Sequence, residues 1–241
     1  TRCPTCGPTV ESLPATADPI GETRRRVATG DIVAVKGIGG FHLACDATSD
    51  AAVALLRERK GRVDKPFAVM VADLATAVEI AHVDDNEARL LTSRERPIVL
   101  VAKRSDAGLA NGVAPGNGHV GIMLPYTPLH DLLLTPGDVW VMTSGNLAEE
   151  PIVTGNHEAL DRLSGLADGY LLHDRDIFVP CDDSVVRILD GAEYPIRRSR
   201  GYAPFPVPLP FDVAPILATG GELKATFCLA AGRDGFMSQH I

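Results

Sequence analysis

The stretch VKGIGGFHLACDATSD, from Val35 to Asp50, decides the fold of this chain. An apolar, β-branched run (DIVAVK, 31–36) ends at a lysine and predicts a buried strand. Three of the next four residues are glycines, and TSDAAVALLRERKGR (48–62) predicts an amphipathic helix with Thr48 or Ser49 as its cap. A strand that leads through glycines toward a helix brings backbone N–H groups and a helix N-terminus close to an anion.

Lys36 and the glycines Gly37, Gly39 and Gly40 are therefore candidates for an anion site. Their spacing is neither that of a Walker A loop nor that of the dinucleotide fingerprint. A tight turn between strand and helix explains the glycines equally well. Lys36 favours the anion-binding interpretation, because a lysine that closes a buried strand is costly without an anionic partner.

The same patterns continue along the chain and predict an α/β fold. Further strands are expected at 65–72, 97–103, 138–146, 169–174, 183–190 and 193–199, with a short strand and a helix within 116–134. Further helices are expected at 20–30, 73–83, 84–93 and 157–168. The last two strands can pair through the turn at Asp190 and Gly191. Residues 204–215 hold several prolines, which block helices and strand interiors, so we expect a linker there and the start of a second domain at 216–241.

The composition limits the possible functions. The chain has 241 residues, 45% of them hydrophobic, and a formal net charge of −8, which makes non-specific nucleic-acid binding a poor hypothesis. Its five cysteines are an odd, scattered set, which indicates a reducing compartment, and we expect a cytoplasmic protein. We see no signal peptide and no membrane-spanning run. The start at Thr1 leads us to expect a piece of a longer protein.

Two polar clusters follow predicted elements. Lys60, Arg62 and Lys65 lie at the end of the helix and in the loop before the next strand. That loop leads into a strand beside the one that ends at Lys36, and ligands sit at such strand ends in open α/β sheets. A solvated helix end is the alternative. Thr143, Ser144 and Asn146 follow a buried strand and can hydrogen-bond a nucleotide or a carboxylate, although a polar turn is common there.

Two further segments carry charge. In CDDSVVR, Ser184 enters a strand after Asp182 and Asp183, which could hold Mg²⁺, although exposed loop acids usually hold nothing. Arg198 stands with two other arginines in IRRSRGYAP, where it can grip phosphate or belong to a basic surface strand.

A partial metal site is indicated at the start of the chain. Cys3 and Cys6 in CPTCGP are the usual half of a zinc knuckle, but the other half is missing. Cys45 and Cys181 have no evident base and are best interpreted as buried thiols.

Together, several of these segments resemble the YrdC-like domain of the HypF carbamoyltransferases, which mature [NiFe]-hydrogenase. The matching segments are VKGIGGFHLACDATSDAAVALLRERKGRVDKPFAVMV, SRERPIVLV, IMLPYTPLHDLLL, VMTSGNLAEEPI, HDRDIFVPCDDSVVR and RRSRGYAP. The resemblance implies a YrdC-like twisted, open mixed sheet with flanking helices at 20–203. It also implies the end of a zinc-finger module at 1–19 and the first strands of an actin-like transferase domain at 216–241.

The resemblance implies that ATP and a carbamoyl group, from carbamoyl phosphate or carbamate, form carbamoyl-adenylate and pyrophosphate. It implies ATP and Mg²⁺ as cofactors, Zn²⁺ in the zinc-finger module, and the C-terminal cysteine of HypE as the final acceptor. By motif, Lys36, Lys60 and Arg62 would be catalytic. The ATP and carbamoyl-adenylate would be bound by Gly37, Gly39, Gly40, Lys65, Thr143, Ser144, Asn146, Ser184 and Arg198.

Three other functions remain open. The wider family includes threonylcarbamoyl-adenylate synthases of tRNA modification, which usually read Tyr-Gly-Leu where this chain has Phe41 to Leu43 and often carry arginine where it has Met123. A double-stranded RNA-binding module and an antibiotic O-carbamoyltransferase are the other two. The adenylation hypothesis requires that Lys36, Lys60, Arg62 and Arg198 converge on one cavity.

Overall fold

The structure is a computed structural model that describes residues 7–147, 150–221 and 225–239. Its strands are β1 (Val10–Leu13), β2 (Val33–Lys36), β3 (Phe41–Asp46), β4 (Ala68–Val71), β5 (Ala81–His82), β6 (Ile98–Lys103), β7 (His119–Met123), β8 (Val139–Ser144), β9 (Gly169–His173), β10 (Val185–Leu189), β11 (Ala192–Arg197), β12 (Val207–Thr219) and β13 (Phe227–Met237). Its helices are α1 (Pro19–Ala28), α2 (Asp50–Lys60), α3 (Leu74–Ile80), α4 (Asp85–Leu91), α5 (Pro128–Leu133) and α6 (Asn156–Arg162).

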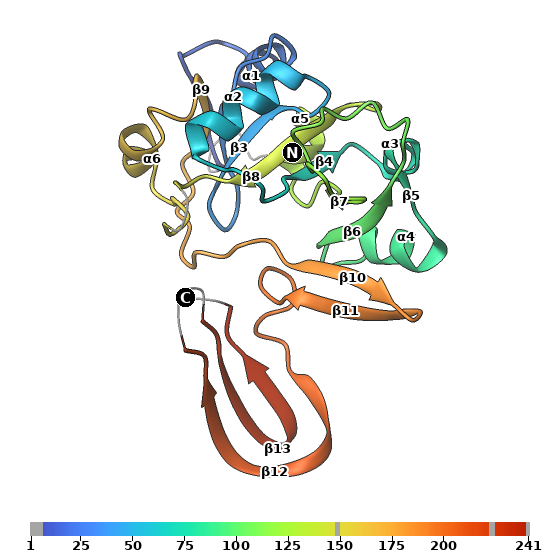
Figure 1. Cartoon of the computed structure of the whole chain (residues 1–241). Coiled ribbons are helices and arrows are strands. Elements are labelled where there is room, and N and C mark those ends of the chain that lie inside the picture. Colours follow the sequence, from blue (N-terminus) through green and yellow to red (C-terminus); the bar gives the residue numbers. More distant parts are fainter. Residues whose placement is uncertain (1–6, 148–149, 222–224, 240–241) are drawn as a thin grey trace.

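One large mixed sheet organises the molecule (Figure 1). Its strand order is β1-β9-β2-β3-β8-β4-β7-β6-β10-β11, with β5 paired to β6. The pairs β2–β9, β4–β7 and β6–β10 are parallel, and the others are antiparallel. The prediction of an open mixed sheet with flanking helices is confirmed.

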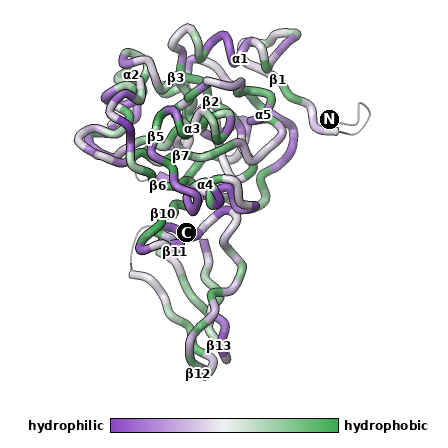
Figure 2. The backbone as a smooth tube through the Cα atoms, turned by 90° about the vertical axis from the view of Figure 1, so that its right-hand side faces the viewer, coloured by the Kyte–Doolittle hydropathy of each residue, from purple (hydrophilic) through white to green (hydrophobic). Residues whose placement is uncertain are grey.

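Both faces of the central strands are buried, which explains the continuous apolar runs of the sequence. Along β8, Val141 belongs to the larger hydrophobic cluster, whereas Trp140 and Met142 belong to a smaller cluster on the opposite face. In Figure 2 the hydrophobic residues accordingly concentrate in the body of the sheet. None of the helices in the described part of the chain is long and apolar enough to cross a bilayer.

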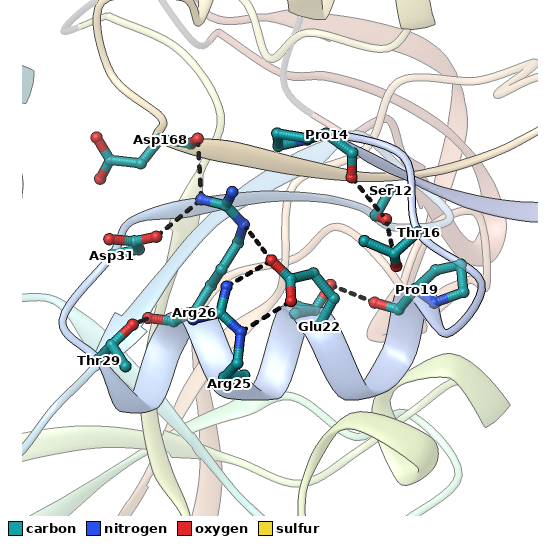
Figure 3. A network of polar contacts seen from close by, with 11 residues as sticks. Ser12, Pro14, Thr16, Pro19, Glu22, Arg25, Arg26, Thr29, Asp31 and Asp168 are labelled. Carbon is teal, nitrogen blue, oxygen red and sulfur yellow. Dashed lines mark hydrogen bonds and ion pairs between the residues drawn. The ribbon is translucent and has the colours of Figure 1, made fainter.

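The helix ends follow the signals in the sequence. Ser49 caps α2 by accepting a hydrogen bond from the Ala52 amide, and Gly61 ends it in the left-handed region at φ 61°. Helix α1 is tied to the sheet by Arg26, which bonds Glu22, Asp31 and the backbone carbonyl of Asp168 (Figure 3). These contacts join α1 to the loops that enter β2 and β9.

Two predictions about the start of the sheet need correction. The segment FHLACD is β3, which pairs antiparallel to β2, so residues 37–40 form a hairpin turn and do not lead into a helix. Residues 10–13 form β1, which pairs with β9, so the sheet begins before the domain boundary predicted at residue 20. The reason in both cases is that tertiary pairing overrides a weak local pattern.

The proline-rich segment 204–215 is not a plain linker. Most of it belongs to β12, which pairs only with β13 in a ribbon that extends away from the sheet in both views (Figures 1 and 2). Proline is tolerated in a strand that is paired on one side, because the N–H groups on its unpaired edge make no hydrogen bonds to a neighbouring strand. The register also shifts between Pro208 and Val213, where pairing is interrupted.

Candidate functional site

A cavity of about 470 Å³ lies where β8 ends and β4 begins. Its wall is formed by His42, Arg62, Lys65, Pro66, Phe67, Ala68, Ile98, Leu100, Asn117, His119, Gly121, Met142, Thr143, Ser144, Ile152, Cys181, Asp182, Asp183, Val185, Ile196 and Arg197. Part of the wall is apolar sheet surface from β4, β6 and β7. Gly121 lets the Ile98 side chain pack directly against β7 in this surface, since a Cβ on Gly121 would come within 2.8 Å of Ile98 Cγ2. This volume lies in the range of small-molecule sites.

Arg62 is a half-buried cation of the wall. Its guanidinium donates to the Lys65 carbonyl through Nε (2.9 Å), to Thr143 Oγ1 through Nη1 (3.0 Å) and to the Pro66 carbonyl through Nη2 (2.5 Å), and it stacks on Phe67 at 4.6 Å. Burial, then the charges of Arg57 and Arg197, lower the pKa of Arg62 to about 10. Among the residues that the structure describes, no carboxylate forms an ion pair with Arg62. A half-buried guanidinium in this state is stabilised by an incoming anion.

The loop after α2 and the end of β8 supply the groups around Arg62. Lys65, Thr143 and Ser144 line the same cavity, as the sequence predicted, and Arg197 joins them from β11. Ser144 Oγ donates to Asn146 Oδ1 at 2.8 Å, which fixes the turn behind the hydroxyl. Cations and hydroxyls at one end of an apolar cavity can bind a phosphate ester whose remaining part is apolar or aromatic.

Lys60 does not line the cavity. It is 4% exposed, and its ammonium donates to the carbonyls of Ser144 and Asn146 (2.6 Å each) and to Asn146 Oδ1 (2.9 Å). Asn146 is likewise buried, and its Nδ2 donates to the Glu150 carbonyl. Because buried polar groups need partners, both residues are held one layer behind the wall, where they position Ser144.

The glycine hairpin is built for packing. The Gly37 amide bonds the Gly40 carbonyl, so it does not face a ligand. A Cβ on Gly39 would lie 2.3 Å from the Cys181 carbonyl oxygen, and one on Gly40 would lie 2.3 Å from Ile152 Cδ1. Lys36 is 3% exposed, donates to the His173 carbonyl at 3.0 Å, and has a pKa lowered chiefly by burial. The tight-turn interpretation of this stretch is therefore favoured over an anion site.

Two more predicted residues point away from the cavity. Arg198, which follows the end of β11, lines a separate groove beside β12 and stacks on Tyr202, whereas Arg197 lines both this groove and the cavity. Ser184 is fully buried, donates to the Arg200 carbonyl and accepts from the Ser199 amide. The predicted convergence of four cations is thus wrong for Lys36, Lys60 and Arg198, and only Arg62 of that set lines the cavity.

A polar network lies beside Ser144 in the cavity wall, because His42 is the cross-strand partner of Ser144 in the pairing of β3 with β8. Asp183 Oδ2 bonds His42 Nε2 at 3.0 Å, and Asp183 Oδ1 accepts from Arg200 Nε at 2.7 Å. Arg200 lies 3.5 Å above the ring centre of Tyr126. Burial raises the pKa of Asp183, but the hydrogen bond and charge of His42 and the charge of Arg200 outweigh it and hold that pKa well below its usual range. The carboxylate therefore stays ionised in the wall.

The described residues offer little for a metal ion. No three histidine, cysteine, aspartate or glutamate side chains gather within residues 7–147, 150–221 and 225–239. The predicted partial zinc site, Cys3 and Cys6, lies outside the described residues.

The fold and the cavity define an α/β protein that carries a basic, ligand-sized site on one edge of a mixed sheet. The chain belongs to the Sua5/YciO/YrdC family, whose model, described as telomere recombination, matches residues 25–199.

Three comparisons refine this assignment. The chain is 53% identical over 244 residues to carbamoyltransferase HypF2 of Cupriavidus necator, covering 93% of this chain and 30% of that relative. It is similar to a crystal structure of full-length HypF in a phosphate- and nucleotide-bound form, with a TM-score of 0.93 and 47% identity over all of this chain and 32% of that one. It also resembles a crystal structure of P. abyssi Sua5 complexed with L-threonine, with a TM-score of 0.66 and 18% identity over 75% of this chain and 54% of that one, which shows a shared fold.

The chain spans about a third of the length of these curated carbamoyltransferase relatives. Those relatives are named as carbamoyltransferases, which are enzymes.

Proposed function

We propose that this chain binds ATP and activates a carbamoyl group as carbamoyl-adenylate, with release of pyrophosphate. The observation that carries the proposal is Arg62, a half-buried guanidinium without a carboxylate partner among the described residues, which lines a cavity together with the hydroxyls of Thr143 and Ser144. Such a cation is stabilised by a phosphate oxygen and positions it through fixed N–H directions. The similarity to a nucleotide-bound HypF structure supports the same ligand class.

The reaction asks little covalent chemistry of the protein. A carbamate oxygen attacks the α-phosphorus, a new P–O bond forms, and the bond to the leaving pyrophosphate breaks. Arg62, Lys65 and Arg197 would neutralise the phosphate oxygens as negative charge moves onto pyrophosphate. Thr143 and Ser144 would fix the nucleotide, and the apolar surface of β6 and β7 suits the base.

Lys60 serves this chemistry indirectly in the proposal. It holds the carbonyls of Ser144 and Asn146, so it fixes the turn that presents Ser144 to the cavity. Lys36, Ser184 and Arg198 have no contact with the ligand in this account.

Mg²⁺ would enter with the nucleotide. A magnesium ion in such enzymes is commonly held by substrate phosphates, waters and one or two carboxylates. Asp182 is the carboxylate of the wall that could reach it, and the ion would neutralise phosphate charge.

We further propose that the carbamoyl group originates from carbamoyl phosphate and passes to the C-terminal cysteine of HypE, in hydrogenase maturation. Both proposals rest on the similarity to the longer HypF relatives.

ATP–pyrophosphate exchange tests the proposed function. Exchange that depends on ammonium carbamate, and not on threonine with bicarbonate, is expected. Exchange that requires threonine would instead identify a threonylcarbamoyl-adenylate synthase. No exchange with either acid, despite a folded protein, would contradict adenylation.

A further inference from the structure

The cavity combines cations for an anionic ligand with a buried carboxylate, and the carboxylate needs an explanation. Asp183 lies in the wall, and its side chain is 10% exposed. An ionised carboxylate repels the phosphates and carboxylates that Arg62 and Lys65 attract. It is useful in such a site only where the ligand presents N–H or O–H donors.

The surrounding residues hold this carboxylate in one orientation and one charge state. Arg200 binds Oδ1 at 2.7 Å, while its two terminal nitrogens donate to the carbonyls of Glu95 (3.0 Å) and Arg96 (2.8 Å). His42 binds Oδ2 at 3.0 Å. The guanidinium offsets the negative charge, so Asp183 adds an acceptor to the cavity without making that end strongly anionic.

His42, Arg200 and the Tyr126 hydroxyl hydrogen-bond the Asp183 carboxylate, whose two oxygens offer about four lone-pair positions, so acceptor capacity remains for a ligand in the cavity. The neighbouring wall is close-packed, because Cys181 touches the glycine hairpin and Ile152 fills the space above Gly40. The wall beside Asp183 therefore suits a small group better than a purine, for which the sheet surface near Leu100 and Gly121 is available.

We infer that Asp183 is a specificity-determining residue that accepts a hydrogen bond from the amino group of the carbamoyl substrate, held for this purpose by Arg200 and His42. The inference rests on the proposed function. It explains how a cationic cavity selects carbamate over acids of the same shape, since acetate replaces the amino group by a methyl group and has no donor. A site built to hydrogen-bond a substrate N–H rejects the analogue without it by about 10⁴-fold.

Asp183→Asn is the matched substitution. Arg200 can only donate, so it keeps the amide oxygen, and the amide nitrogen takes the place of Oδ2. His42 can accept from that nitrogen in its other tautomer, which moves the ring proton to Nδ1, a buried atom without a hydrogen-bond partner among the described residues. The substitution therefore costs some stability, and the cavity meets a donor in place of an acceptor.

The experiment compares kcat/KM for exchange with ammonium carbamate and with sodium acetate in wild type, Asp183→Asn and Asp190→Asn. We expect the preference of the wild type for carbamate to fall by about 100-fold or more in Asp183→Asn. Asp190→Asn makes the same change at an exposed carboxylate in the turn between β10 and β11, so it should keep that preference within about threefold of wild type. Thermal unfolding and the KM for ATP serve as folding controls.

Equal losses with carbamate and acetate would mean a merely structural role and would overturn the inference. A raised KM for ATP with an unchanged preference would assign Asp183 to the nucleotide and would overturn it too. If wild type shows no carbamate-dependent exchange, the proposed function itself fails. Should Asp183→Asn not fold, N,N-dimethylcarbamate replaces the variant, because it has no N–H donor. Wild type should then reject it as it rejects acetate, and efficient use would contradict the inference.

Discussion

Replacing Lys60 by methionine separates a positioning role from a catalytic one. The change keeps the length and apolar stem of the side chain and removes only the ammonium, which makes hydrogen bonds of 2.6, 2.6 and 2.9 Å to three acceptors of Ser144 and Asn146. Each buried acceptor that loses its partner costs about 1–3 kcal/mol. The substitution also ends the desolvation of a buried cation, which offsets part of this cost.

We therefore expect Lys60→Met to lower the free energy of unfolding by about 3 kcal/mol. At about 2–4 °C per kcal/mol for a chain of this size, the melting temperature should fall by roughly 9 °C. Calorimetry or urea unfolding measures this loss of stability. ATP–pyrophosphate exchange should also show a raised KM for ATP, because Ser144 loses its support.

Lys103→Met is the matched control, since Lys103 lies partly exposed at the end of β6. It should change stability by no more than about 0.5 kcal/mol. If Lys60→Met leaves stability within 1 kcal/mol of wild type (roughly the cost of one ordinary hydrogen bond) yet abolishes exchange, the ammonium acts on the substrate and our placement of Lys60 is wrong.

Two further predictions concern packing and pH. Gly39→Ala would bring a Cβ within 2.3 Å of the Cys181 carbonyl oxygen, so it should lower the free energy of unfolding in urea by about 1–3 kcal/mol. Gly118→Ala is the control, because a Cβ there meets nothing within 4 Å, and its loss should be far smaller. Equal losses would refute the packing role of Gly39. Burial lowers the pKa of His130 from 6.5 in the unfolded chain to about 3 in the folded protein. Between pH 6.5 and pH 3 only the unfolded state binds a proton at His130, so the free energy of unfolding falls as the pH decreases through this range. Between pH 7 and pH 5 this loss should be about 2 kcal/mol, and His130→Phe should remove it; an unchanged pH slope in denaturation would contradict this origin.

Much of the fold was predictable because the central strands are buried on both faces. The runs at β2, β4 and β8 are continuously apolar, and α2 carries its cap at Ser49 and its terminating glycine at Gly61, so local signals and tertiary structure agree. Strand β3 was missed because nothing local distinguishes a glycine hairpin from a strand-to-helix loop. Strand β12 was missed because the proline rule holds for strands with partners on both sides.

The site was predictable in part. Thr143, Ser144 and Lys65 follow strand or helix ends that meet at the cavity, and their positions in the sequence indicated this. Whether Arg197 or Arg198 faces the cavity depends on the strand register, which shifts between Val185 and Val186 of the paired strand.

Residue type alone did not show that Lys60 is buried behind the wall. The pairing of His42 with Asp183 joins positions 141 residues apart and has no spacing signal.

The affinity for ATP in Arg62→Gln and Arg198→Gln, measured by isothermal titration calorimetry against wild type, tests most directly whether the cavity holds the triphosphate. Loss of charge-assisted hydrogen bonds worth about 3 kcal/mol should weaken binding by about 100-fold in Arg62→Gln. Arg198→Gln should stay within about threefold of wild type, because its side chain lies in the other groove. Wild-type affinity in Arg62→Gln, or an equal loss in both variants, would contradict the account.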